Sequence, residues 1–93
     1  MGIDVGTTGC KVVVFNPEEK IIRHSYQEYG IDVPQAGWAE QDPQVWWEAT
    51  KRCIKKILIK IKPEDIEAVG LCGQMHTHVL LDKTCKPLRP AIT

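Results

Sequence analysis

Two short apolar runs joined by a small polar turn open the chain. The runs are residues 3–5, which include one acid, Asp4, and residues 12–15. The sequence GTTG lies between them, and its two glycines allow a left-handed backbone and the close approach of another group. This pattern predicts a β-hairpin with residues 6–9 at its tip.

Polar and apolar residues then mix over residues 20–29. We interpret this segment as a third strand in an outer or edge position, because neither face is uniformly apolar. Residues 30–41 have no period and contain two glycines and a proline, which predicts a surface loop. Trp38 in this loop is expected to anchor it by burying a large apolar area, with ligand contact as the alternative.

A long amphipathic helix is predicted for residues 43–62. Asp42 is a typical N-cap, and Pro43 suits the first helical position. Apolar residues recur at spacings of three and four along one face, whereas lysines and an arginine occupy the opposite face. We interpret this basic stripe as a solvated face, with an anionic partner as the alternative. Pro63 is expected to end the helix.

Residues 66–72 form a short β-like run after the helix. A strand that follows a helix and earlier strands is expected to run parallel to the opening strand. A further apolar run lies at residues 79–81. The predicted fold class is therefore α/β, with an antiparallel three-stranded start, a long helix and one or two more strands.

The composition narrows the classes of function. The 93 residues, 43% hydrophobic and 26% charged, suit at most one small globular domain. Twelve basic residues balance twelve acidic ones, which gives no electrostatic reason to expect a nucleic-acid or membrane partner. No segment has the roughly 18 apolar residues that a membrane span needs, and we see no signal segment. We expect a cytosolic protein.

Four cysteines are spread through the sequence without a C-x-x-C pair. Cytosolic thiols stay reduced, and at least three of these lie in apolar runs, where cysteine behaves as a small hydrophobe. We therefore predict structural rather than redox roles for Cys10, Cys53, Cys72 and Cys85.

The turn at residues 6–9 has chemistry that suits phosphate. Its threonine hydroxyls and backbone N–H groups are donors that face outward. Asp4 before the turn is placed to hold a metal ion or its water, and Lys11 after it is placed to meet an anion. The turn is neither a Walker loop nor a dinucleotide turn, because a strand rather than a helix follows it. A plain structural hairpin turn is the alternative.

A second candidate site follows the predicted strand at residues 66–72. Ligands often bind where strands end in α/β sheets, and Gln74, His76 and Thr77 are of the kind that bind polyhydroxylated molecules. Alternatively, His76 and His78 are metal ligands, since alternate residues on a strand share a face. No nucleophile motif and no local pair of carboxylates is recognisable.

Three blocks of sequence together resemble the N-terminal part of FGGY-type carbohydrate kinases, and among these the xylulokinases look most similar. In order, the blocks are GIDVGTTGCKVVVFN, GWAEQDPQVWWEA, and GLCGQMHTHVLLD with PLRPAI, spread over residues 3–92. The resemblance implies a ribonuclease H-like fold of the actin-like ATPase (ASKHA) class, in which two domains flank a cleft for ATP, Mg²⁺ and sugar. Residues 1–93 would then be the N-terminal portion of the first domain, without the second.

The resemblance also implies roles for individual residues. The turn would face the ATP phosphates, and Asp4 would help to organise the metal and the transferring phosphoryl group. Trp38 belongs to a block that shapes the loop before the first helix. The expected cofactor-binding residues are Gly6, Thr7, Thr8, Gly9 and Lys11. The expected substrate-binding residues are Gln74, Met75 and His76.

Two departures limit what the resemblance implies. Thr77 stands where the family more often has a small residue, commonly glycine, which leaves the exact sugar open. The family's catalytic aspartate lies beyond residue 93, and none of Asp4, Asp42 and Asp82 matches it. We expect the full-length parent to transfer the γ-phosphoryl group of ATP to a ketose such as xylulose, and the isolated chain to be inactive.

Two alternatives remain open. One is a sibling kinase for glycerol, gluconate or another polyol, and the other is a non-catalytic actin-like module that binds nucleotide or a partner protein. The expected partners are a small-molecule sugar and, as one option, a second copy of the protein in a homodimer. Neither nucleic acid nor a membrane is an expected partner.

Overall fold

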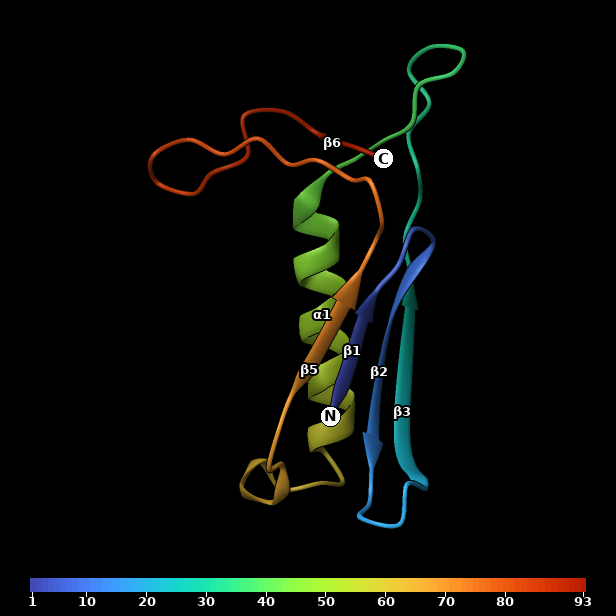
Figure 1. Cartoon of the computed structure of the whole chain (residues 1–93), viewed down its shortest axis with the longest axis vertical. Coiled ribbons are helices and arrows are strands. Elements are labelled where there is room, and N and C mark those ends of the chain that lie inside the picture. The colour runs from blue at the N-terminus through green and yellow to red at the C-terminus, as the bar shows by residue number, and fades with distance from the viewer.

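A four-stranded mixed sheet with one helix along its face forms the body of the protein (Figure 1). The computed structural model describes all of residues 1–93. In sheet order, the strands are β3 (Ile21–Glu28), β2 (Gly9–Phe15), β1 (Gly2–Val5) and β5 (Gly70–Gly73). The first three are antiparallel neighbours, and β5 runs parallel to β1. The predicted hairpin, third strand and parallel neighbour are confirmed.

The helix α1 (Pro43–Leu58) begins where the sequence predicts. Asp42 has extended backbone, and its side chain accepts a hydrogen bond from the backbone N–H of Gln44 at 2.9 Å, as an N-cap does. The buried residues of the helix lie on its predicted apolar face, which packs on the sheet. Trp47 lies outside that face and is exposed. The Lys51 ammonium lies 5.5 Å from the centre of the Trp47 ring, which is close enough for a cation–π interaction.

The helix ends at Leu58, four residues before the predicted boundary. The backbone N–H groups of Lys60 and Ile61 both donate to the carbonyl of Ile57, so the last turn is tight and does not continue. Lys62 is already extended, because the residue before a proline is disfavoured in the helical region. Pro63 starts a separate 3-10 helix, Pro63–Asp65.

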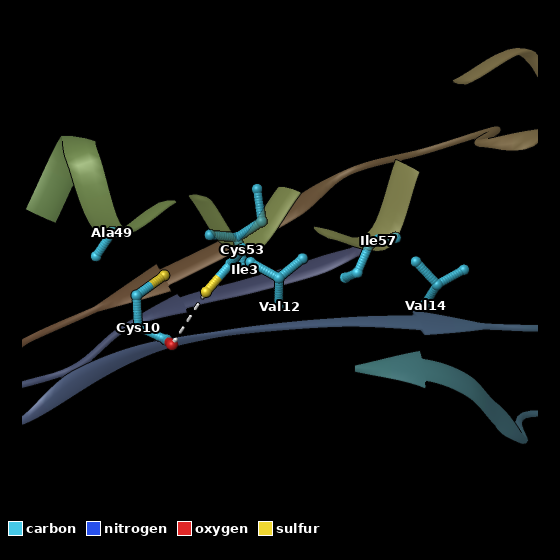
Figure 2. Close-up of a cluster of buried hydrophobic side chains, with 7 residues drawn as sticks. All are labelled: Ile3, Cys10, Val12, Val14, Ala49, Cys53 and Ile57. Carbon is cyan, nitrogen blue, oxygen red and sulfur yellow. Dashed lines mark hydrogen bonds between the residues drawn. The ribbon is translucent and has the colours of Figure 1, made fainter. Parts of the chain in front are cut away.

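The core lies between α1 and one face of the sheet (Figure 2). Alternate residues of β1 and β2 point to this face because side chains alternate along a strand. The Cys53 thiol on α1 points at the carbonyl of Cys10 on β2, with 3.6 Å between sulfur and oxygen, and burial raises the pKa of the Cys10 thiol. The buried apolar residues are Ile3, Cys10, Val12, Val14, Ala49, Cys53 and Ile57.

The four cysteines divide into two kinds. All are free, but only Cys10 and Cys53 are buried and have the predicted structural role. Cys72 and Cys85 are exposed, so the prediction of a packing role is wrong for them. Cys72 lies beside Asp4 in the neighbouring strand, and a hydrogen bond to that carboxylate, with its negative charge, raises the pKa of the Cys72 thiol.

The strand β5 is shorter than the predicted run at residues 66–72. It pairs only from Gly70 onward, because its partner β1 begins at Gly2. Before that point, Ala68 still contacts the start of the chain: its carbonyl accepts a hydrogen bond from the Met1 ammonium at 2.8 Å. The length of the strand is thus limited by its neighbour rather than by its own sequence.

A second, two-stranded sheet holds the connecting segments together. It pairs β4 (Glu40–Gln41) with β6 (Ala91–Ile92), and these lie side by side above the N-terminal end of α1 (Figure 1). The predicted loop at residues 30–41 therefore ends in a short strand. The apolar run at residues 79–81 forms no strand, since only an isolated bridge joins Leu81 to Pro87.

Trp38 does not anchor its loop. The side chain is 49% exposed, so the predicted burial is wrong. The loop is held instead by a pair of backbone hydrogen bonds between Asp32 and Glu40, each 2.8 Å long, and by an ion pair of Glu40 with Arg89. These contacts, together with Gln41, replace the aromatic anchor.

Candidate functional site

The turn between β1 and β2 is closed by one backbone hydrogen bond, from the N–H of Gly6 to the carbonyl of Gly9 at 3.0 Å. Gly9 leaves room for an aromatic ring, since a Cβ there would lie 2.4 Å from the hydroxyl oxygen of Tyr26 on β3. The ring of Tyr26 thus covers the backbone where β2 begins. The close approach of this ring explains a glycine at the end of the turn.

Three consecutive carbonyl groups of the turn accept hydrogen bonds from the body of the protein. The carbonyl of Gly6 accepts from the Tyr29 hydroxyl at 2.5 Å and from Gln74 Nε2 at 3.1 Å. That of Thr7 accepts from Gln41 Nε2 at 2.7 Å, and that of Thr8 from the backbone N–H of Tyr29 at 3.1 Å. These bonds point the acceptor side of the turn inward.

The donor side of the turn points the other way. In a trans peptide the C=O and the following N–H lie in one plane and point in opposite directions, so an inward carbonyl directs the next N–H outward. Thr7 and Thr8 are exposed, and neither backbone N–H has an acceptor within the protein. The turn therefore presents two adjacent unpaired N–H donors and two hydroxyl groups to solvent, which is an arrangement suited to an anion.

Tyr29 supports the turn from the end of β3. Burial, with the negative charges of nearby groups, raises the pKa of Tyr29 to about 12. Its hydroxyl is therefore protonated at all physiological pH values and remains a donor to the carbonyl of Gly6. This residue is absent from the sequence-based site, because an aromatic residue at a strand end is ordinarily a packing residue.

Asp4 and Lys11 stand opposite one another on the two strands that lead to the turn. Both are exposed on the face of the sheet that α1 does not cover. No ion pair joins them, since the ion pairs of the protein are Lys51 with Glu48 and Arg89 with Glu40. The two charges are therefore free to meet groups of opposite sign near the turn.

Gln41 is a second residue that sequence reasoning missed. Its side chain is only 1% exposed, yet all four of its hydrogen-bonding positions are used. Nε2 donates to the carbonyls of Thr7 at 2.7 Å and Gly30 at 3.0 Å, and Oε1 accepts from Trp46 Nε1 at 3.0 Å and Gln74 Nε2 at 2.9 Å. A glutamine before a helix is usually exposed, so nothing in the sequence pattern indicated burial.

Gln74 joins the second candidate segment to the turn. Its Nε2 donates to both the Gly6 carbonyl and Gln41 Oε1, and its Oε1 accepts from the Thr77 hydroxyl at 3.1 Å. The side chain that was expected to line a sugar pocket is thus engaged within the protein. The structure brings Gln74 together with the turn, whereas its contact with substrate stays a prediction.

Met75 and His76 extend beyond this junction. Met75 is 82% exposed, and His76 is exposed with a positive φ of 56°, which is uncommon for a residue other than glycine. Residues held in this region are often found at ligand sites. The metal alternative gains no support, because no three His, Cys, Asp or Glu side chains gather anywhere in the protein.

Two of the aspartates, Asp42 and Asp82, have identifiable structural contacts. Asp42 caps α1, and Asp82 accepts hydrogen bonds from the backbone N–H groups of Lys86 and Thr84 and from the Thr84 hydroxyl, which lowers the pKa of Asp82. Of the three aspartates Asp4, Asp42 and Asp82, only Asp4 lies on a strand that leads into the turn. No helix in the structure combines the length and the apolar character that would take it across a membrane.

Comparison with known proteins identifies the family. The model for the N-terminal domain of the FGGY family of carbohydrate kinases matches residues 1–93. A xylulose kinase of Escherichia coli is 39% identical over 92 residues, and a glycerol kinase of Leptospira biflexa is 40% identical over 95 residues. Each alignment covers 99% of this chain and 19% of the relative, so the chain spans about a fifth of the length of the curated relatives.

Solved structures agree on the fold. The crystal structure of a gluconate kinase from Lactobacillus acidophilus superimposes with a TM-score of 0.90 at 30% identity, and the match covers 99% of this chain and 18% of that one. The predicted α/β class, as part of an actin-like ATPase domain, is confirmed. The chain belongs to the FGGY family of carbohydrate kinases.

Proposed function

We propose that this chain forms the phosphate-facing wall of an ATP-dependent kinase that phosphorylates a ketose, with xylulose as the favoured substrate. The observation that carries this proposal is the pair of outward N–H groups at Thr7 and Thr8, which have no acceptor in the protein. Their carbonyl partners are held by the body, so the donors are oriented before any ligand arrives. Such preoriented donors stabilise charge that develops on a transferring phosphoryl group.

The side chains around the turn fit Mg²⁺-ATP. Two hydroxyl groups and the ammonium of Lys11 add donors and positive charge for phosphate oxygens. Mg²⁺ usually binds one or two carboxylates and completes its shell with phosphates and water, so the single carboxylate of Asp4 is sufficient. When bound, Mg²⁺ supplies positive charge that offsets the charge of the phosphates. Asp4 would hold it, and Lys11 with the turn would hold the phosphates.

The sugar would meet the segment that follows β5. Met75 and His76 are exposed at its tip, where they are free to contact a ligand, whereas Gln74 holds the base of the segment against the turn. The similarity to a xylulose kinase supports a ketose as acceptor. The similarity to a glycerol kinase is equally high, which makes glycerol or another polyol the second candidate.

Activity would need more protein than these 93 residues. Asp42 and Asp82 are engaged in a cap and a turn, and Asp4 is assigned to the metal, so none is available to take the proton from a sugar hydroxyl. Leu71 on the unpaired edge of β5 is 75% exposed, beside an apolar groove of about 490 Å³ between that edge and α1. We infer that the chain is the N-terminal portion of a first domain, and that the remainder covers this groove and supplies the base. Homodimerisation stays a prediction.

The test is a substrate panel on the full-length kinase that contains this sequence. ADP release from ATP is measured with xylulose, glycerol, gluconate and no acceptor. We expect turnover with xylulose that exceeds the acceptor-free rate by at least about a hundredfold, since water is a poor competitor in a closed kinase site. Preferred turnover of glycerol or gluconate would replace the ketose assignment, and equal rates with and without any acceptor would refute the kinase proposal. Phosphorylation by residues 1–93 alone would refute the inactive-fragment proposal.

A further inference from the structure

Four separate segments of the chain meet at the side chain of Gln41. Its amide forms hydrogen bonds with Thr7 in the turn and with Gly30 in the loop. It also forms hydrogen bonds with Gln74, directly after β5, and with Trp46 in α1. The amide has two N–H donors and an oxygen with two lone pairs, and each of the four has one partner. A buried amide that is fully satisfied in this way holds its partners in one arrangement, because losing any one bond leaves a buried polar group unpaired.

The bond to Thr7 has a direct consequence for the proposed phosphate site. The carbonyl of Thr7 and the N–H of Thr8 belong to the same peptide plane and point in opposite directions. Gln41 therefore sets the direction of the Thr8 N–H through the 2.7 Å bond to the Thr7 carbonyl. Gln74 has the same relation to the preceding peptide, since its 3.1 Å bond to the Gly6 carbonyl, together with the 2.5 Å bond from the Tyr29 hydroxyl, sets the direction of the Thr7 N–H.

The two glutamines are joined to each other by the 2.9 Å bond from Gln74 Nε2 to Gln41 Oε1. Gln74 is also the residue from which the exposed Met75 and His76 extend. The orientation of the turn and the placement of the proposed sugar-contacting residues are consequently coupled through one pair of side-chain amides.

We propose that Gln41 is a positioning residue that sets the phosphate-facing turn and the segment beginning at Gln74 in the relative geometry needed for in-line transfer. The proposal rests on the proposed kinase function and adds a specific residue to it. Gln41 is only 1% exposed, so it has almost no surface for a ligand and would act through its partners Thr7 and Gln74. Transfer is sensitive to such positioning, because a shift of about 1 Å in a reacting group lowers the rate by up to about a hundredfold.

The principal test replaces Gln41 by residues of similar shape in the full-length kinase. Gln41→Met removes all four hydrogen bonds, and Gln41→Glu keeps an acceptor oxygen at Oε1 but removes both donors. We expect kcat to fall by about tenfold to a hundredfold in both variants, with the KM for ATP and for the sugar changed by less than about threefold. A rise in the KM for ATP at unchanged kcat would overturn the proposal, since Gln41 would then support nucleotide binding alone.

Two control variants separate positioning from general stability. Gln44→Glu makes the same chemical change at an exposed glutamine three residues away, and we expect its kcat to be unchanged. Ile57→Val removes one buried methylene near the far end of α1, which lowers the Tm without touching the turn. If Ile57→Val loses kcat as strongly as the Gln41 variants at a matched loss of Tm, the effect is structural and the proposal is wrong.

A double-mutant cycle tests the coupling between the two glutamines. If Gln41 and Gln74 act through one link, Gln41→Met combined with Gln74→Met loses little more kcat than the more damaging single change. Fully additive losses in log kcat would show independent roles and overturn the coupling.

A crystal structure of the Gln41→Met variant provides a readout that does not depend on activity. We expect the carbonyl of Thr7 to turn away from its inward direction once its donor is lost. An unchanged peptide would overturn the proposal even if the protein phosphorylates no sugar. Conversely, an active wild-type enzyme with normal Gln41 variants would refute this proposal and leave the kinase function in place.

Discussion

The two segments that we propose to face ligands are held in opposite ways. The turn at residues 6–9 has three consecutive carbonyl groups bonded to Tyr29, Gln41 and Gln74, and only the N–H groups of Thr7 and Thr8 remain free. The segment after β5 is tied at its base by Gln74, and beyond that residue Met75 is 82% exposed. One segment is preorganised, whereas the tip of the other is open.

This difference fits the tasks proposed for the two segments. Phosphoryl transfer needs donors that are already oriented, because reorientation during the reaction would raise the barrier. An acceptor site that differs between xylulose, glycerol and gluconate kinases can vary at an exposed tip without disturbing the turn. The comparison teaches that hydrogen bonds within the protein are concentrated on the segment that we propose to face the phosphates.

The largest expected effect concerns the open segment. We expect His76→Ala in the full-length kinase to lower kcat/KM for the sugar by about tenfold to a hundredfold, since a lost hydrogen bond to a bound substrate costs about 1–3 kcal/mol. The KM for ATP should stay within about twofold, because the turn does not contact His76 through any hydrogen bond. Steady-state kinetics with each substrate varied in turn provides the measurement.

His78→Ala is the matched control, since His78 is also exposed and contacts Ile92 only through its backbone. His76→Asn is a second variant, because asparagine tolerates a positive φ and keeps the backbone as it is. Sugar kinetics that are unchanged in both His76 variants would remove this residue from the acceptor site and weaken the contrast between the segments.

The next effect tests the preorganised turn. In Gly9→Ala the new Cβ would lie 2.4 Å from the Tyr26 hydroxyl oxygen, so the ring has to move from the start of β2. We expect a loss of about 1–2 kcal/mol of stability and a severalfold higher KM for ATP. Gly30→Ala is the control, because nothing lies within 4 Å of a Cβ there. Equal results for both glycines would show that the turn tolerates displacement of Tyr26.

A smaller effect is expected at Tyr29. Tyr29→Phe removes one of the two donors to the Gly6 carbonyl and should lower the free energy of unfolding by about 1 kcal/mol at pH 7. Tyr26→Phe is a suitable control, since that hydroxyl makes no hydrogen bond within the protein and the residue is 44% exposed. Urea titrations of the full-length protein measure both.

The stabilisation by Tyr29 has a defined pH window. Its pKa is raised from 10 to about 12, so the protonated hydroxyl favours the folded state fully below pH 10, and this contribution is lost as pH rises through about 12. The stability difference between wild type and Tyr29→Phe should therefore shrink between pH 10 and 12 and stay constant below that range. A difference that changes between pH 6 and 9 would contradict this assignment.

The smallest expected effect lies at the base of the open segment. Thr77→Val keeps the side-chain shape but removes the hydroxyl that donates to Gln74 Oε1 at 3.1 Å. We expect a change of about 0.5–1 kcal/mol in stability and less than about threefold in the KM for the sugar. A tenfold rise in that KM would instead indicate that Thr77 contacts the sugar directly, and the base of the segment would then belong to the acceptor site.

Several features of this protein could be predicted from the sequence alone, because they depend on the chemistry of short stretches of the chain. The opening hairpin followed from two apolar runs around GTTG, and the start of α1 followed from Asp42 and Pro43, because turns and caps depend on a few adjacent residues. The family followed from three short blocks, and the donor-rich turn was recognisable as a candidate phosphate site. Each of these features depends on neighbours in the chain.

Only the tertiary structure decided which polar groups are buried and bonded. Gln41, Tyr29 and Gln74 reach the turn from 21 to 68 residues away along the chain, and no local pattern distinguishes a glutamine that will be 1% exposed from one on the surface. The same reason explains the errors at Trp38 and β5: the burial of a side chain and the length of a paired strand depend on the neighbours that folding brings to them.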